Sequence, residues 1–298
     1  MKTLIVVTGP TAVGKTELCL DIARHFNIPI INADSRQIYR ELKIGTAAPT
    51  EEQMRQVRHF FVGNLSINDY YSASMFENQV MGLLHQLFQT NDIALMCGGS
   101  MMYIDAVCNG IDDIPTVSDD IRTELKNRLA VEGLESLCQQ LKTLDPEHYE
   151  IVDHKNPRRV VHALEICLMT GRTYTSFRTN EKKERPFRVV KIAINRPREE
   201  LYERINRRVD MMMEEGLLDE AKGLFEQRHL NALNTVGYKE MFNYLDGVWT
   251  LPEAIERLKG NTRRYARKQL TWFKKDQTVT WFSPDNKDDI INFIHQQL

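Results

Sequence analysis

A glycine-rich loop near the start of the chain has the residue types and the spacing that bind phosphate. Residues 9–16 read Gly9-Pro10-Thr11-Ala12-Val13-Gly14-Lys15-Thr16 and match G-x-x-x-x-G-K-[ST] in full. In such a loop, called here the P-loop, successive backbone N–H groups point at phosphate oxygens, and the following helix N-terminus adds a positive field. Lys15 can neutralise a phosphate, and Thr16 can hold a Mg²⁺ ion. The loop predicts a site for a di- or triphosphate; nucleotides such as ATP are its commonest ligands.

A carboxylate is expected beside this loop. Asp34 ends the apolar run Ile28–Ala33, and the carboxyl ends of parallel strands face the ligand crevice of an α/β sheet. There Asp34 could bind Mg²⁺ or act as a general base toward an acceptor. It could equally cap a helix that begins within residues 34–36. Sequence spacing alone does not separate these roles.

A basic helix near the C-terminus is the third feature that could do chemistry. Residues 257–275 contain eight basic residues and no acidic one, with Trp272 among them. Arg and Lys neutralise phosphates and aromatic rings stack on exposed bases, so this composition suits RNA, although a solvated basic face has the same composition. An apolar stripe at helical spacing is expected to pack on the core. The basic residues are Arg257, Lys259, Arg263, Arg264, Arg267, Lys268, Lys274 and Lys275; the stripe is Ile255, Leu258, Thr262, Tyr265, Ala266, Gln269, Leu270 and Phe273; smaller basic groups are Arg158-Arg159 and Arg204 with Arg207 and Arg208.

Strands alternating with helices must position the P-loop and Asp34. Thr3–Thr8 is a continuous apolar, β-branched run, typical of a parallel strand that is buried on both faces. An amphipathic helix over Lys15–Phe26 follows, then strands over Ile28–Ala33 and Ile93–Cys97, with a helix over Ala73–Gln89 between them. This order predicts an α/β fold with a P-loop NTPase-like core and a parallel sheet.

The middle of the chain predicts a separate helical unit. It contains helical patterns without a convincing strand, with helix starts after Ser118 and at Pro157 and a stop at Gly171. Strand character returns over Phe187–Asn195. We expect an all-helical insertion over 112–186 between two parts of one core, 1–111 and 187–298, with later helices over Arg198–Glu215, Leu217–Arg228 and from Pro252.

Composition and charge exclude several classes of protein. The 298 residues carry 39 Lys+Arg against 41 Asp+Glu, a net charge of −2, so contact with RNA requires a local basic patch. Neither a long apolar segment nor a signal peptide is present, and we expect a cytoplasmic protein that does not enter a membrane. The cysteines Cys19, Cys97, Cys108, Cys138 and Cys167 are widely spaced, which argues for reduced thiols and against a zinc site or disulfides.

Several motifs, taken in order along the chain, resemble the tRNA dimethylallyltransferases, also called tRNA isopentenyltransferases. The resemblance spans about residues 3–282. The P-loop alone is shared by many families, whereas Asp-Ser-Arg-Gln after the second strand together with the basic Arg-Arg-Tyr-Ala-Arg-Lys-Gln-Leu-Thr-Trp is far more specific. The motifs are GPTAVGKT (9–16), ADSRQIY (33–39), IGTAAP (44–49), GGSMMYIDA (98–106), NPRRVVHALEI (156–166), TVGYKEM (235–241) and RRYARKQLTWFKK (263–275).

The resemblance implies that the P-loop holds the diphosphate of dimethylallyl diphosphate, with Mg²⁺, rather than a nucleotide. The dimethylallyl group would go to N6 of the adenosine immediately 3′ of a tRNA anticodon, with that base flipped out of its stack. Lys15, Thr16 and the loop amides would stabilise the departing diphosphate. Asp34 would accept the proton of the adenine amino group, and Thr11 and Ser100 would help to position the substrates.

The resemblance also implies a set of tRNA contacts and a simple assembly. We expect a monomer that binds the tRNA anticodon stem-loop. Ser100 stands where the family more often has Thr, His162 replaces a frequent Arg, and no zinc-finger extension follows the basic helix, which implies a bacterial-type member. The implied tRNA-binding residues are Asp34, Ser35, Arg36, Gln37, Ser100, Arg158, Arg159, Tyr238, Lys239, Arg267, Lys268, Gln269, Thr271, Trp272 and Lys274.

Two other functions share some of these features. A small-molecule or nucleoside kinase would use the same loop for ATP and Asp34 as base for a hydroxyl, but it would leave the basic helix without a purpose. A non-catalytic, nucleotide-gated RNA-binding protein would not need Asp34 in the crevice. Label from dimethylallyl diphosphate entering tRNA separates both from the transferase.

Overall fold

The chain leaves one folded unit after Asn109 and returns to it at Glu184. In the computed structural model, which describes residues 1–179 and 181–298, a core unit is formed by Met1–Asn109 with Glu184–Leu298, and a helical unit by Gly110–Lys183. The boundaries expected from the sequence, after residues 111 and 186, lie close to these two points.

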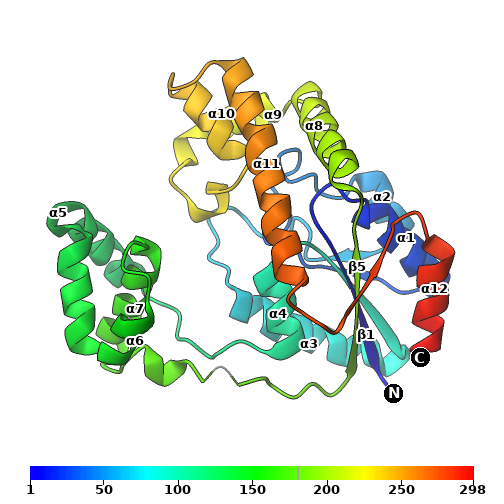
Figure 1. Ribbon diagram of the computed structural model, residues 1–298, viewed down its shortest axis with the longest axis horizontal. Helices are drawn as coiled ribbons and strands as arrows, with labels where there is room; N and C mark the ends of the chain where they lie inside the picture. Colours follow the sequence, from blue (N-terminus) through cyan, green and yellow to red (C-terminus); the bar gives the residue numbers. More distant parts are fainter. Residues whose placement is uncertain (180) are drawn as a thin grey trace. The chain divides into compact units, whose positions relative to one another are not determined.

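The core unit is built on a six-stranded parallel sheet in the order β3-β2-β4-β1-β5-β6. Its neighbouring strands β1 and β5 are labelled in Figure 1. The central strand β1 pairs in parallel with β4 on one side and with β5 on the other, so that Val6 lies opposite both Met96 and Lys191. The P-loop therefore leaves the sheet at its centre. The strands are β1 Thr3–Thr8, β2 Ile30–Asn32, β3 His59–Phe60, β4 Ile93–Cys97, β5 Arg188–Ile194 and β6 Val279–Phe282. The short β3 and β6 were not predicted.

Helices cover both faces of the sheet because its strands are apolar on both sides. Leu4 and Val6 of β1 pack into one hydrophobic cluster, and Ile5 and Val7 pack into the other. The first cluster includes α3 Ala73–Thr90, α4 Met101–Asn109, α9 Leu217–Gly223 and α10 Tyr238–Leu245; the second includes α1 Lys15–Phe26 and α12 Lys287–Gln296; α8 Arg198–Glu214 and α11 Leu251–Phe273 contribute to both, and α2 Glu51–Gln56 buries no residue.

The helical unit has its own hydrophobic core and, in its described residues, no strand. Asn156 caps α7 by accepting the N–H of Arg159, and Gly171 ends that helix with a φ of 66°. Gly133, with a φ of 81°, kinks α5. The helices are α5 Asp119–Leu144, α6 Pro146–Ile151 and α7 Pro157–Thr170, followed by the short 3₁₀ helix η1 Thr175–Phe177.

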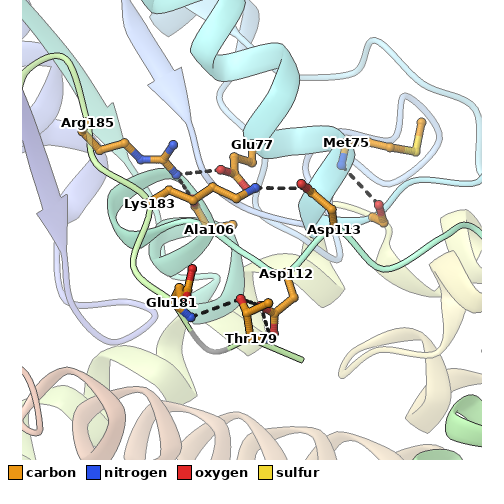
Figure 2. Close-up of polar contacts among 10 residues, drawn as sticks. Met75, Glu77, Ala106, Asp112, Asp113, Thr179, Glu181, Lys183 and Arg185 are labelled. Carbon is orange, nitrogen blue, oxygen red and sulfur yellow. Dashed lines mark hydrogen bonds and ion pairs between the residues drawn. The ribbon is translucent and has the colours of Figure 1, made fainter. Parts of the chain in front are cut away.

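Polar contacts hold the chain at both sides of the connection between the units (Figure 2). In the helical unit, Lys183 Nζ lies 3.0 Å from Asp113 Oδ1, and the Thr179 hydroxyl donates to Asp112 at 2.8 Å. In the core unit, the buried Arg185 donates to Glu77 Oε1 at 2.7 Å and to the carbonyl oxygen of Ala106 at 2.6 Å. The point where the chain enters the helical unit and the point where it leaves are therefore neighbours.

One predicted helix is wrong in extent. The helix expected over Leu217–Arg228 ends at Gly223, and a 3₁₀ turn, η2 Phe225–Gln227, follows. Glycine is the weakest helix former after proline, which accounts for the early end. The five cysteines are free thiols, as expected. Within residues 1–179 and 181–298, none of the helices combines the length and the apolar character needed to cross a membrane.

Candidate active site

The P-loop backbone adopts a conformation that leaves amide groups available for an anion. Gly9 has a φ of 146°, and a Cβ atom there would lie 2.5 Å from the carbonyl oxygen of Ile194. Gly14, with a φ of 112°, is the N-cap residue of α1, and no side chain caps the N–H groups of that helix. The free N–H groups at the start of α1 can therefore bind phosphate oxygens.

Lys15 folds back over the P-loop. Its Nζ donates to the carbonyl oxygens of Gly9 and Pro10 at 3.0 and 2.8 Å. Burial of the ammonium group lowers the pKa of Lys15 to about 8. Thr16, the next residue, is exposed. A poorly hydrated cation beside free amides favours a bound anion.

Arginines of α8 and of the segment before it donate hydrogen bonds to backbone carbonyl oxygens of the P-loop. Arg204 Nε donates to the carbonyl oxygen of Ala12 at 2.9 Å, and Arg196 Nε donates to that of Val13 at 3.0 Å. Arg208 Nη1 lies 3.5 Å from Thr11 Oγ1. Arg204 and Arg208 share a helix face because they are four residues apart. From the sequence, Arg204, Arg207 and Arg208 were a candidate group for RNA contact. The four-residue spacing of Arg204 and Arg208 indicates that both can face the P-loop. Arg196 was not identified from the sequence.

Asp34 lies at the carboxyl end of β2, as predicted. Its Oδ1 accepts the backbone N–H groups of Arg36 at 2.9 Å and Gln37 at 3.3 Å and so holds a turn. Since the next helix along the chain is α2 Glu51–Gln56, no helix begins at residues 34–36, and the alternative role of Asp34 as a helix cap is wrong. Among the described residues, Oδ2 has no hydrogen-bond partner. The buried Ser100 fixes the same turn, because its hydroxyl accepts the N–H of Ser35 at 2.8 Å and donates to Ser35 Oγ at 3.1 Å. One carboxylate oxygen is thereby oriented and the other left for a ligand.

Residues of the P-loop, Asp34 and the arginines of α8 line one cavity of about 1160 Å³ at the carboxyl ends of β1, β2 and β4, whereas Ser100 is not among its lining residues. This volume exceeds the usual range of ligand pockets, about 300–1,000 Å³, and is large enough for a diphosphate and a second substrate group. Burial raises the pKa of the lining Tyr265, and the nearby Asp34 charge adds to this effect. The lining includes Thr11, Ala12, Gly14, Lys15, Thr16, Asp34, Gln37, Arg204, Arg207, Arg208, Tyr265 and Gln269, together with residues 42–44 and 46–51.

A wall of this cavity, residues 43–46, is held by a carboxylate that the sequence did not reveal. Glu220 accepts the backbone N–H groups of Lys43, Ile44 and Gly45 at 2.9–3.1 Å and the hydroxyl of Tyr238 at 2.6 Å. Tyr238 is fully buried. Since its ring lies under this wall, we leave it out of the proposed RNA surface.

The side chains after Asp34 also contact protein. Arg36 Nη1 donates to the carbonyl oxygens of Asn231 and Ala232 at 3.1 and 3.2 Å. Gln37 Nε2 donates to those of Thr46 and Ala47 at 3.0 Å. Both side chains therefore connect the turn at Asp34 to surrounding loops.

The predicted RNA-binding residues on and just after helix α11 differ in their exposure to solvent. Arg267, Lys268, Thr271, Trp272 and Lys274 are exposed, whereas Gln269 is buried. Trp272 is 39 % exposed and is oriented by a 2.8 Å hydrogen bond from its Nε1 to Asp105. The predicted apolar stripe is confirmed by the burial of Leu258, Ala266, Gln269 and Phe273. Lys239 of the core unit and Arg158 and Arg159 of the helical unit are exposed as well.

Two thiols complete the floor of the cavity. Cys97, at the end of β4, and Cys19, on α1, both line it. A hydrogen bond from the Cys19 thiol lowers the pKa of Cys97, and the nearby Lys15 charge acts in the same direction. Burial raises the pKa of Cys19. Neither residue was singled out from the sequence, where no C-x-x-C pair marks them.

The donor set of the cavity fits a Mg²⁺ ion that is bound together with its phosphate ligand. The Thr16 hydroxyl and the Asp34 carboxylate both line the cavity. The described residues contain no group of three or more His, Cys, Asp or Glu that could hold a metal ion. Mg²⁺ commonly keeps several waters and binds through one or two protein oxygens plus substrate phosphates, which is what this set provides.

Comparisons with known proteins agree on one family. The family model described as IPP transferase matches residues 37–276. A tRNA dimethylallyltransferase 1 of Bacteroides thetaiotaomicron is 59% identical over 297 residues, covering 100% of this chain and 96% of that protein. A tRNA dimethylallyltransferase 1 of Phocaeicola vulgatus is 61% identical over 293 residues, covering 98% of each.

Solved structures show the same relationship. The tRNA isopentenylpyrophosphate transferase of Bacillus halodurans is similar with a TM-score of 0.72 and 37% identity, covering 99% of this chain and 96% of that one. A eukaryotic dimethylallyltransferase acting on tRNA is similar with a TM-score of 0.80 and 25% identity, covering 95% of this chain and 74% of that one. The parallel sheet and the helices around it are therefore shared across these proteins.

Proposed function

The chain belongs to the IPP transferase family of tRNA dimethylallyltransferases, and we propose that its P-loop cavity is where the prenyl donor meets the target base. It is a prenyltransferase that transfers a dimethylallyl group to tRNA. We propose that the acceptor atom is N6 of the adenosine immediately 3′ of the anticodon and that diphosphate is released. The observation that carries the proposed site is the presence of the P-loop, Arg208 and Asp34 around one cavity.

Dimethylallyl diphosphate is the donor that this cavity fits. The amides at the start of α1, the Lys15 ammonium and the Arg208 guanidinium would bind its diphosphate. As the bond between the allylic carbon and the diphosphate oxygen breaks, negative charge grows on the departing diphosphate. Donors that are already in place stabilise that charge without reorganising, which lowers the barrier.

Asp34 would act on the other substrate. Its Oδ1 is engaged by the backbone of Arg36 and Gln37, which aims the remaining oxygen. That oxygen would accept a hydrogen bond from the adenine amino group and take its proton as nitrogen attacks the allylic carbon. The new N6–C bond replaces the broken C–O bond, and the proton ends on the carboxylate. Thr11 and Ser100 would position the two substrates.

The implied Mg²⁺ ion has a place in this arrangement. Thr16 would hold it, and when bound it would supply positive charge to the diphosphate oxygens. Since the family consists of prenyltransferases that generally need a divalent metal, we propose Mg²⁺ as that metal.

We propose tRNA-binding residues separately for the core unit and for the helical unit, and all of them are exposed. In the core unit they are Lys239, the exposed α11 residues Arg267, Lys268, Thr271 and Trp272, and Lys274 directly after that helix. In the helical unit they are Arg158 and Arg159. Guanidinium and ammonium groups neutralise RNA phosphates, and Trp272 offers a ring face to an unstacked base. We propose a cytoplasmic monomer that binds the anticodon stem-loop.

Transfer of label tests this function directly. The purified chain is incubated with Mg²⁺, unmodified tRNA and either labelled dimethylallyl diphosphate or labelled ATP. We expect label in tRNA only from dimethylallyl diphosphate, at the adenosine 3′ of the anticodon. Label that enters only from ATP, or no label at all, would contradict the proposal.

A further inference from the structure

The helix with the exposed basic residues also reaches the P-loop through one buried side chain. Gln269 is 2 % exposed, although its neighbours Lys268 and Thr271 on α11 are exposed. Its Oε1 accepts the backbone N–H of Thr11 at 2.9 Å, and its Nε2 donates to the carbonyl oxygen of Gly99 at 2.8 Å. One amide group thus joins α11, the P-loop and the loop after β4.

The site is shaped for an amide in one orientation. A Cβ atom at Gly99 would lie 2.4 Å from Gln269 Nε2, so only glycine leaves room for this side chain. Thr11 offers a donor and Gly99 offers an acceptor. A glutamate could satisfy the first but not the second, and a methionine of similar length could satisfy neither.

The bond to Gln269 determines how Thr11 takes part in the P-loop. Because its N–H is engaged by Gln269, Thr11 does not present that group to the diphosphate. Its hydroxyl remains beside Arg208 and faces the same cavity as Lys15. A small displacement of α11 would therefore displace Thr11 and, with it, the groups that contact the diphosphate.

We propose that Gln269 is a positioning residue that couples RNA bound on the exposed face of α11 to diphosphate bound by the P-loop, an inference that rests on the proposed function. RNA that fixes the position of α11 fixes Thr11 through Gln269. Diphosphate that orders the P-loop favours the same position of α11. Each ligand then raises the affinity for the other by an equal factor, since coupling between two binding sites is reciprocal.

The experiment measures this factor with two probes that do not react with each other. Calorimetry gives the affinity of the full chain for inorganic pyrophosphate with Mg²⁺, with and without a saturating unmodified anticodon stem-loop RNA. We expect the RNA to raise the affinity by about 5–150-fold, the usual range of such coupling. In Gln269→Met the factor should fall to about one while each ligand still binds alone. Gln269→Glu, which keeps the Thr11 bond only, should give a smaller factor than the unmodified chain and serves if the Met variant does not fold.

Asn261→Ala is the matched control on the same helix. Asn261 Nδ2 donates to Glu240 Oε1 of α10 at 2.6 Å and does not contact the P-loop. This variant should lower the thermal midpoint, as the Gln269 variants should also do, but it should retain the coupling factor. A factor of one in the unmodified chain with both ligands bound, or a factor retained in Gln269→Met and Gln269→Glu, would overturn the proposal. Failure of the unmodified chain to bind either probe would instead refute the proposed function.

Discussion

The Oδ1 atom of Asp34 accepts the backbone N–H of Arg36 at 2.9 Å, so one oxygen of the proposed base is used to hold a turn. Because the amide oxygen of asparagine can accept the same hydrogen bond, Asp34→Asn should preserve the turn and remove only the basic oxygen. We expect turnover to fall by about 10²–10⁴-fold while tRNA binding is unchanged. Single-turnover kinetics and filter binding measure the two quantities. Asp34→Ala, which also loses the turn, should weaken tRNA binding as well; an unaltered rate in Asp34→Asn would show that Asp34 is not the base.

The lowered pKa of Lys15 predicts that donor binding weakens in mild alkali. Burial brings this pKa to about 8, and a diphosphate binds the charged form of the side chain. Above that pKa, each pH unit should therefore lower the affinity for dimethylallyl diphosphate by about tenfold, whereas below it the affinity should level off. The terminal phosphate ionises near pH 6, so a titration from pH 7 to 10 reports the protein. A constant affinity for dimethylallyl diphosphate across this range would show that Lys15 does not titrate between pH 7 and 10. The affinity for tRNA, measured over pH 7–8, is the control.

Cys97 should be the most reactive thiol in the chain. The Cys19 thiol lowers its pKa by hydrogen bonding, whereas burial raises the pKa of Cys108 to about 12. A lower pKa gives more thiolate, which is the form that iodoacetamide attacks. We expect alkylation of Cys97 first and protection of it by inorganic pyrophosphate, since it lines the same cavity as Lys15. Peptide mass spectrometry over time measures both; faster labelling of Cys108, or labelling of Cys97 unaffected by pyrophosphate, would contradict this placement.

The exposed Arg267 should contribute to the salt dependence of tRNA binding. A guanidinium that neutralises one phosphate releases a counterion, so Arg267→Ala should weaken binding and reduce the log–log salt slope by about 0.7–0.9. Arg24 is the matched control, because it lies in the last turn of α1 and hydrogen-bonds Gln56 of α2. Arg24→Ala should leave the slope unchanged. Equal salt slopes in the unmodified chain, Arg267→Ala and Arg24→Ala would show that Arg267 is a solvated surface residue that does not contact a tRNA phosphate.

Gly45, in the wall formed by residues 43–46, should tolerate substitution poorly. A Cβ atom there would lie 2.6 Å from Cζ of Tyr238, a ring that is fully buried and held by Glu220. Gly45→Ala should lower the free energy of unfolding by about 1–3 kcal/mol through overpacking. At Gly82, inside α3, an added Cβ meets nothing within 4 Å, so Gly82→Ala should raise it by about 0.5–1 kcal/mol. Chemical denaturation measures both, and a Gly45→Ala protein as stable as the parent would show that the ring moves aside.

The strands and helices that carry the P-loop could be predicted because local pattern determines them. The apolar run and the glycines define β1, the loop and α1 to the residue. β3 and β6 were missed because two and four residues carry too little pattern. They are strands only because a longer neighbour supplies their hydrogen bonds.

The site was predictable where backbone motifs define it and not where side chains cross from distant elements. Lys15 begins the helix that follows β1 and its loop, and Asp34 comes just after β2, so their placement follows from topology. The contact of Arg204 with the P-loop requires that β5 lie beside β1, which brings α8 to the loop. Gln269 matched both an apolar stripe and a basic RNA segment, and only its burial separates the two roles.

The chain enters the helical unit at Gly110 and leaves it at Lys183, and these two positions determine whether the unit could be replaced by a linker. Gly110 and Lys183 are so close that a Cβ atom on the first would lie 2.5 Å from Cγ of the second. The neighbours β4 and β5 pair with β1 whatever lies between them in sequence, and the helical unit has a separate core. A short linker from Asn109 to Glu184 would thus close the gap without stretching the sheet. We therefore expect that the helical unit can be removed or exchanged without changing the register of the strands that hold the P-loop.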